Sequence, residues 1–150
     1  MARAIQLSID SAHSGQGGPF GAVIVKDGKI IAEGVNRVTS TNDPTAHAEV
    51  LAIRQACEKL GAFELKDCEL YTSCEPCPMC LAAIYWARLS RIYFANTAAD
   101  AAKIGFDDSF LYGELNQPHS QRRIPTLQMM RDEALAGFRA WAAKPDKIPY

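Results

Sequence analysis

Four side chains of this sequence have the types and spacings of a reactive metal site. They are His47 and Glu49 in His47-Ala48-Glu49, and Cys77 and Cys80 in Pro76-Cys77-Pro78-Met79-Cys80. Zinc that only stabilises a fold usually has four protein ligands, whereas catalytic zinc has three and leaves its fourth position for water. His47, Cys77 and Cys80 supply three ligands, and water at the fourth position would lose its proton near neutral pH. Glu49 is then expected to carry protons.

Each of the two motifs is weak evidence when it is taken alone. A glutamate near a helix start is favourable for the helix dipole whether or not it is functional. Pro-Cys-x-x-Cys indicates a metal of unspecified kind. In this order, with each motif opening a helix, the two match the signature of zinc deaminases. The mixed ligand set disfavours an iron–sulfur cluster, and a purely structural zinc site leaves Glu49 without a purpose.

The reaction that these residues suit is the hydrolytic removal of an amino group from an aromatic base. Water adds to the carbon of an amidine-like unit, the neighbouring ring nitrogen takes up a proton, and the amine leaves as ammonia. One carboxylate that stays off the metal can move all of these protons. Glu49, two residues beyond His47 at a helix start, is placed to do so.

Cys74 is the cysteine whose role the sequence leaves open. The chain has five cysteines, and Cys74, Cys77 and Cys80 follow one another at a spacing that suits metal binding better than disulfide formation. If Cys74 is a fourth ligand, the chain is a non-enzymatic, zinc-stabilised interaction module. If it is not, the site is open for catalysis.

Composition favours a single domain that acts on a small molecule. The 150 residues, 48% apolar and 22% charged, suit one compact domain over residues 1–150. The net charge of -1 provides none of the basic excess typical of nucleic-acid-binding proteins, so a polynucleotide substrate is disfavoured. Neither a membrane span nor a secretory signal is recognisable, which predicts a cytoplasmic protein without a membrane partner.

A helix and a hairpin are expected at the start of the chain. Apolar residues at helical intervals predict a helix over Ala2–Ala12. Two strands, Phe20–Val25 and Lys29–Val35, flank Asp27-Gly28, a dipeptide typical of tight hairpin turns.

The first metal motif is expected near the start of the next helix. Asp43 is a suitable N-cap, Pro44 suits the first turn, and an apolar stripe continues to Leu60 before Gly61. His47 and Glu49 would therefore lie in the first turns of this helix.

The second metal motif is expected between two parallel strands. Strand Glu69–Ser73, helix Pro78–Arg88 and strand Arg91–Ala95 form a β-α-β unit. Ligands of such units usually bind beyond the carboxyl ends of the strands. Cys77 and Cys80, three residues apart at the helix start, would face the same side.

The carboxy-terminal third is the least regular part of the sequence. The segment Asn96–Pro125 is longer than an ordinary connection and is typical of a lid. Residues 125–130 are expected to add a strand, and residues 131–143 a helix with Phe138 and Trp141 packed inward. The elements together predict an α/β fold with a central mixed sheet of about five strands and helices on both faces.

Longer segments of the chain resemble the cytidine and deoxycytidylate deaminase superfamily and, within it, the bacterial guanine deaminases. The resemblance covers nearly the whole length and includes a terminal tyrosine. It is carried by the segments Gly18–Val25, His47–Arg54, Tyr71–Arg88 and Gly105–Phe110.

The resemblance implies a three-layer cytidine deaminase-like fold, a Zn²⁺ cofactor and roles for further residues. Asn36 would bond the purine edge, Asp108 would bind the substrate amine or relay its protons, and Phe20 and Phe106 would sandwich the ring. Tyr150 would cap the pocket. In that family the carboxy-terminal segment is exchanged between two subunits, so a homodimer is expected and the cap would come from the partner.

Together these expectations predict an enzyme that deaminates guanine to xanthine and ammonia, a reaction of purine catabolism or salvage. The alternatives are a tRNA adenosine deaminase, and a deaminase of another nucleobase, a nucleoside or an aminotriazine. The structural zinc module is a third interpretation.

Overall fold

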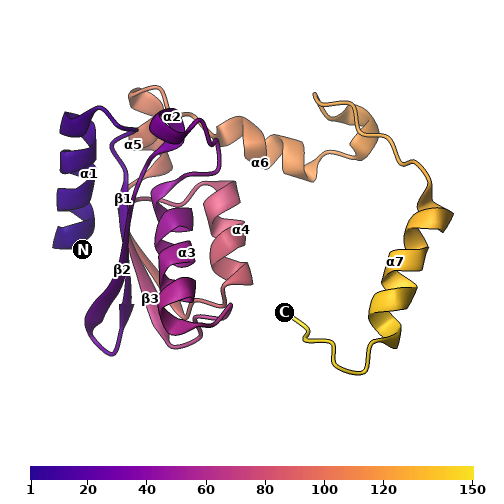
Figure 1. The fold of residues 1–150 in the computed structure, drawn as a ribbon. Coiled ribbons are helices and arrows are strands. Elements are labelled where there is room, and N and C mark those ends of the chain that lie inside the picture. The colour runs from indigo at the N-terminus through magenta and orange to yellow at the C-terminus, as the bar shows by residue number, and fades with distance from the viewer. The chain divides into compact units, whose positions relative to one another are not determined.

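A computed structural model describes all residues, 1–150, and divides the chain into two compact units, Met1–Asp108 and Ser109–Tyr150. The first unit contains a four-stranded sheet in the order β2-β1-β3-β4 (Figure 1). The strands are β1 (Gly21–Lys26), β2 (Lys29–Val35), β3 (Cys68–Cys74) and β4 (Arg91–Asn96).

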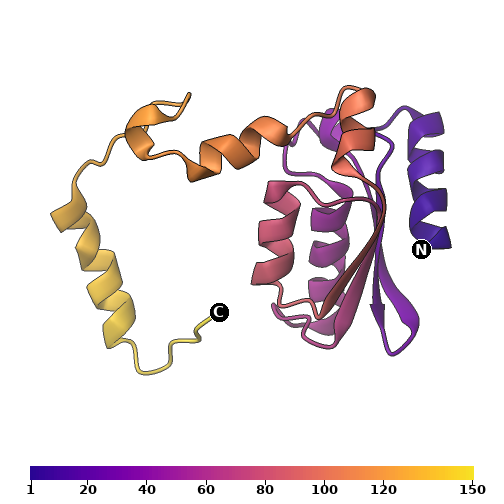
Figure 2. The same cartoon turned by 180° about the vertical axis from the view of Figure 1, so that it is seen from behind.

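Both faces of this sheet carry helices. Helix α1 (Ala2–Ser14) lies on one face, and α3 (Ala48–Leu60) and α4 (Pro78–Trp86) lie together on the other (Figures 1 and 2). Two short helices complete this unit. Along the chain, α2 (Val38–Thr41) follows β2, and α5 (Ala98–Lys103) follows β4. The α/β class with helices on both faces is therefore confirmed.

The sheet is mixed, as predicted, but has four strands rather than about five. β1 pairs antiparallel with β2 and with β3, while β3 and β4 are parallel and are connected by α4. The strand predicted at residues 125–130 is wrong, because this segment has no regular structure and pairs with no strand of the chain. Strand propensity alone does not form a strand, since the backbone groups need a partner strand. β4 is consequently an edge strand.

Small residues bring α3 close to the sheet and so fix the first metal motif. Ala48, Ala52 and Ala56 of α3 are fully buried. A Cβ atom on Gly34 of β2 would lie 2.1 Å from the carbonyl oxygen of Ala48, so only glycine permits this approach. Because Ala48 follows His47, the contact at Gly34 sets the position of the metal motif relative to the sheet.

The helix predicted to start at Pro44, after an N-cap at Asp43, is α3, and it starts four residues later. Asp43 and Pro44 lie in a turn, in which the Asp43 carboxylate accepts hydrogen bonds from the backbone N–H and the hydroxyl of Thr45. The helix begins at Ala48, and its N-cap is His47. An aspartate that can cap a helix can equally close a local turn, and here the turn is formed.

The predicted β-α-β unit is present, with a shorter helix. α4 ends at Trp86 rather than Arg88, because Arg88 has a left-handed backbone with φ of 60°. Ile84 of α4, Leu70 of β3 and Ile24 of β1 belong to one buried core between this helix layer and the sheet.

The second unit contains α6 (Ser109–Asn116), a short 3₁₀ helix (His119–Gln121) and α7 (Arg131–Ala143). The helix predicted at residues 131–143 is confirmed, but the inward packing of its aromatic residues is wrong. Phe138 is 77% exposed and Trp141 is 45% exposed. A pattern identifies an apolar face without identifying what covers it. No helix of either unit combines the length and apolar character that a membrane span requires.

Candidate active site

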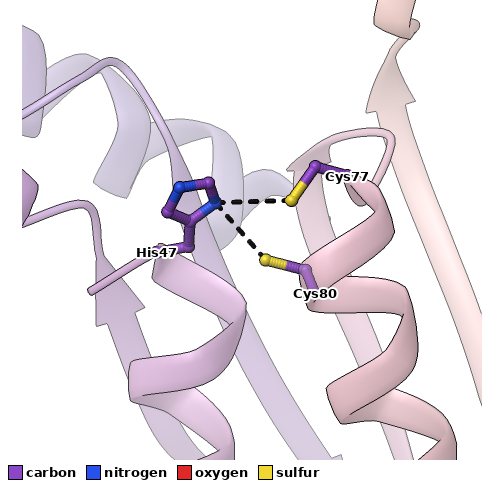
Figure 3. Close-up of side chains that lie close together, drawn as sticks. All are labelled: His47, Cys77 and Cys80. Atoms are coloured by element: carbon purple, nitrogen blue, oxygen red, sulfur yellow. Dashed lines mark hydrogen bonds between the residues drawn. The ribbon is translucent and has the colours of Figure 1, made fainter. Parts of the chain in front are cut away.

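The two metal motifs meet at the amino-terminal ends of α3 and α4. The His47 Nδ1 atom is 3.6 Å from Cys77 Sγ and 3.4 Å from Cys80 Sγ (Figure 3). The ligand atoms of the three residues all lie within 4.8 Å of one another. One imidazole nitrogen and two sulfurs at this separation are donors that zinc prefers, and three of them leave a tetrahedral position open. The residues present therefore fit a catalytic zinc ion.

His47 and Cys77 each occupy the N-cap position of their helix, where Ser, Thr, Asp or Asn usually stands. Neither side chain makes a capping hydrogen bond. The free N–H groups and the positive end of each helix dipole favour negative charge at this place. The sequence thus departs from the local capping rule where a ligand for a cation is needed.

Electrostatics at the site already stabilise a thiolate. A hydrogen bond from Cys80, assisted by His47, lowers the pKa of Cys77 to about 4 against the opposing effect of burial. The same contact with Cys77, together with burial, raises the pKa of Cys80. The pKa of His47 is raised, chiefly because it bonds to Cys77. A bound zinc ion would replace the protons that now lie between Cys80, Cys77 and His47, and it would hold Cys80 as a thiolate too.

Glu49 lies beside the ligands and is only 6% exposed. Its Oε1 atom accepts a hydrogen bond of 3.1 Å from the Thr72 hydroxyl, and its Oε2 atom is 3.4 Å from Cys80 Sγ. Burial raises the pKa of the carboxyl group. A carboxyl group whose pKa moves towards neutrality is suited to both accepting and donating protons.

Cys74 lies outside the group of ligand atoms and has another partner. Its thiol donates a hydrogen bond of 3.6 Å to the carbonyl oxygen of Thr97. Burial raises the pKa of Cys74 to about 11, so this side chain is a neutral thiol. This arrangement gives no support to Cys74 as a fourth ligand.

Asn36 is 5% exposed, and its side chain is oriented by the backbone. Its Oδ1 atom accepts hydrogen bonds from the N–H groups of Gly18 (3.1 Å) and Val38 (3.2 Å). The side-chain NH₂ group is therefore what Asn36 can offer to a ligand. A Cβ atom on Gly17 would lie 2.0 Å from the Asn36 carbonyl oxygen, so the glycine-rich segment permits this close contact.

Phe20 and Phe106 meet, but not as two parallel walls. Their ring centroids are 4.9 Å apart and the rings are nearly perpendicular, at 87°. In this arrangement the two rings are neither parallel nor far enough apart to sandwich a flat base.

Asp108 lies near the thiolate of Cys77. Its pKa is raised, first by burial and then by the negative charge of Cys77. Tyr150, in the second unit, is 73% exposed.

Two residues that sequence reasoning missed support the site from β3 and the loop after it. They are Thr72, which bonds Glu49, and Glu75, whose carboxylate accepts a hydrogen bond of 3.0 Å from the N–H of Ala98. The latter contact joins the metal-ligand loop to α5, which leads to Phe106 and Asp108. Because side chains alternate along β3, Thr72 lies on the same face as the apolar Leu70. A polar residue on the apolar face of a strand was the sign in the sequence that could have identified Thr72.

The family model of the cytidine and deoxycytidylate deaminase zinc-binding region matches residues 1–96. The guanine deaminase of Bacillus subtilis is 58% identical over 148 residues, which cover 99% of this chain and 95% of that protein. The tRNA-specific adenosine deaminase of Agrobacterium fabrum is 53% identical over 76 residues, which cover 51% of this chain and 50% of that protein.

Solved structures give the same relationship. The crystal structure of the Bacillus subtilis guanine deaminase matches with a TM-score of 0.97, over 99% of this chain and 95% of that one. A structure of the guanine deaminase from Nitrosomonas europaea matches with a TM-score of 0.68 and 35% identity, over 71% of this chain and 62% of that one.

Proposed function

This chain belongs to the cytidine and deoxycytidylate deaminase family, and from that premise we propose that it deaminates free guanine to xanthine and ammonia. The observation that carries the proposal is the full-length similarity to a guanine deaminase, combined with a His47, Cys77 and Cys80 cluster beside a buried glutamate. The similarity to the guanine deaminase covers 99% of this chain, whereas the match to the tRNA-specific deaminase covers 51% of it.

The cofactor is zinc, held in this proposal by His47, Cys77 and Cys80. When bound, zinc lowers the pKa of water so that hydroxide is available near neutral pH. Glu49 takes a proton from the attacking water and gives it to the ring nitrogen beside the amino-bearing carbon. It then takes the second proton from the hydroxyl group that has been added to the carbon and transfers it to the amino group, which leaves as ammonia as the carbonyl of xanthine forms. The distance of 3.4 Å between Glu49 Oε2 and Cys80 Sγ supports the role of Glu49 as the proton carrier.

Substrate recognition is assigned to Asn36, Asp108, Phe20 and Phe106. The Asn36 NH₂ group would donate to an acceptor on the purine edge, and one of the two aromatic rings would stack on the base. A polar group of the pocket that is left without a hydrogen-bonding partner costs free energy, so these polar contacts discriminate between bases. Asp108 would accept from the substrate amine or relay its protons.

Replacement of Asp108 by alanine is expected to reduce kcat/KM for guanine by about 10-fold or more, because a hydrogen bond to a charged group is lost. Bound zinc should stay at the parental level, since Asp108 is not a ligand in this proposal. Steady-state kinetics and metal analysis of the purified variant measure the two quantities. The neighbouring Asp107→Ala serves as the matched control. Equal loss of zinc and turnover would instead indicate collapse of the site.

We further propose that residues 1–150 form one deaminase domain, and that two chains form a homodimer with exchanged carboxy-terminal segments. The large apolar side chains of the second unit are exposed and need a covering surface, which a second copy would supply. They include Leu127, Met129, Phe138 and Ile148. In this arrangement the partner subunit's tail brings Tyr150 over the pocket as a cap.

Deletion of Pro149 and Tyr150 is expected to lower kcat/KM for guanine by about 10-fold, equivalent to about 1.4 kcal/mol, because an aromatic contact to the substrate is lost. The fold and the dimer should persist, as circular dichroism and light scattering would report. Tyr150→Phe is the matched control for the ring without the hydroxyl. Unchanged kinetics of the deletion variant would reject the capping role.

The test of the function is ammonia release by zinc-replete protein from a panel of substrates. The panel contains guanine, adenine, cytosine, guanosine, an aminotriazine and an anticodon stem-loop of tRNA. Guanine is expected to be the preferred substrate, with the stem-loop inert. Preference for the stem-loop would favour the tRNA adenosine deaminase alternative, to which the related deaminase from Agrobacterium fabrum belongs. Inertness towards the whole panel would contradict enzymatic activity of either kind.

A reducing compartment suits this site, because zinc is held by thiolates and all five cysteines are free. We therefore place the protein in the cytoplasm.

A further inference from the structure

We propose that Thr72 is a positioning residue for Glu49, and that it makes the two carboxylate oxygens unequal. The Thr72 hydroxyl donates to Oε1 at 3.1 Å, whereas Oε2 is the oxygen near the ligand Cys80, at 3.4 Å. Oε2 is then the atom that exchanges protons during the reaction, and Oε1 serves as the anchor. This inference rests on the proposed function, in which Glu49 moves the protons.

Thr72 is well placed for this role because it is a fixed point of the sheet. It is fully buried in β3, a central strand, where it pairs with Ala22 of β1 and Phe94 of β4. Side chains alternate along a strand, so Thr72 points to the same face as Leu70, towards the layer of α3 and α4. Threonine is also stiff at χ1, so its hydroxyl has few alternative positions.

The glutamate needs such an anchor for two reasons. Its side chain has several rotatable bonds, and a proton carrier must be held in one geometry to be effective. A carboxylate this close to a zinc site is also a potential ligand, and coordination would fill the position that water needs. A hydrogen bond to Oε1 holds the carboxylate back and leaves Oε2 on the side of the ligand Cys80.

The test compares Thr72→Val, which removes the hydroxyl at nearly constant volume, with Thr72→Ser, which retains it. Thr72→Val is expected to lower kcat by about 10-fold or more, because the proton carrier is no longer held. KM should change less than kcat, and zinc should remain at the parental level. Thr72→Ser should restore most of kcat. A Thr72→Val variant with near-parental kcat, or a Thr72→Ser variant as impaired as Thr72→Val, overturns the proposal. Loss of zinc in proportion to kcat does so too.

A double-mutant cycle tests the contact without any measurement of activity. In the metal-free protein with Glu49 present, Thr72→Val should lower the thermal unfolding midpoint by at least about 2 °C, because the buried carboxyl group loses the hydrogen bond to its Oε1 atom. In the Glu49→Leu background the same change should be neutral or stabilising, because an unpaired hydroxyl is removed. Equal effects in both backgrounds overturn the contact. If the panel above shows no deamination of guanine while the cycle shows coupling, the proposed function has failed and the contact stands.

Discussion

Glu49→Gln is expected to retain zinc and to lose at least about 100-fold in turnover, the lower end of what general acid–base catalysis contributes. A 100-fold loss corresponds to about 2.7 kcal/mol of transition-state stabilisation. The amide matches the carboxylate in size and can still accept the hydrogen bond from Thr72. It cannot accept and release the protons of the reaction. Steady-state kinetics with guanine, alongside metal analysis of the same preparation, measure both expectations.

Glu58→Gln is the matched control for this substitution, since Glu58 lies on the same helix, α3, and is exposed. It should leave turnover and zinc content unchanged. A Glu49→Gln variant with full zinc and near-normal turnover would show that another group carries the protons. A variant that has lost its zinc would show that Glu49 helps to hold the metal, which contradicts its assignment as a free carboxylate.

The second large effect is expected from Cys77→Ser compared with Cys74→Ser. In Cys77→Ser a thiolate whose pKa lies at about 4 is replaced by a hydroxyl that stays protonated. Zinc affinity should fall by more than the roughly 10- to 100-fold that the loss of an outer-shell partner costs, and turnover should fall to the level of the metal-free protein. Zinc titration of the stripped variants, followed by activity on zinc addition, provides the measurement.

Cys74→Ser makes the same chemical change three residues away and should be tolerated. Its hydroxyl can donate to the Thr97 carbonyl oxygen as the thiol does, so zinc binding and turnover should remain close to the parental values. If Cys74→Ser loses zinc as readily as Cys77→Ser, Cys74 is a fourth ligand. The site would then be structural and the proposed enzyme activity would be wrong.

The sequence by itself determined which residues could form the site and most of the elements that carry them. The motif around His47 and the motif around Cys77 are short and local, and each has a physical signature in residue type and spacing. The first hairpin, the β-α-β unit and the last helix are likewise local patterns with a period of two or of about 3.6 residues. These predictions are confirmed because each pattern can be recognised within a short stretch of the sequence.

Only the tertiary structure decided how the motifs meet and which neighbours complete them. Asp43 could have capped the helix, but α3 starts at Ala48, the residue whose carbonyl oxygen lies against Gly34 of the sheet. Cys74 could have been a ligand, but its thiol faces Thr97. Residues 125–130 could have formed a strand, but no strand of the chain pairs with them. Each outcome depends on contacts between segments far apart in sequence, which local propensity does not encode. The same holds for the buried hydroxyl of Thr72, which meets Glu49 only because β3 packs beneath the first turn of α3.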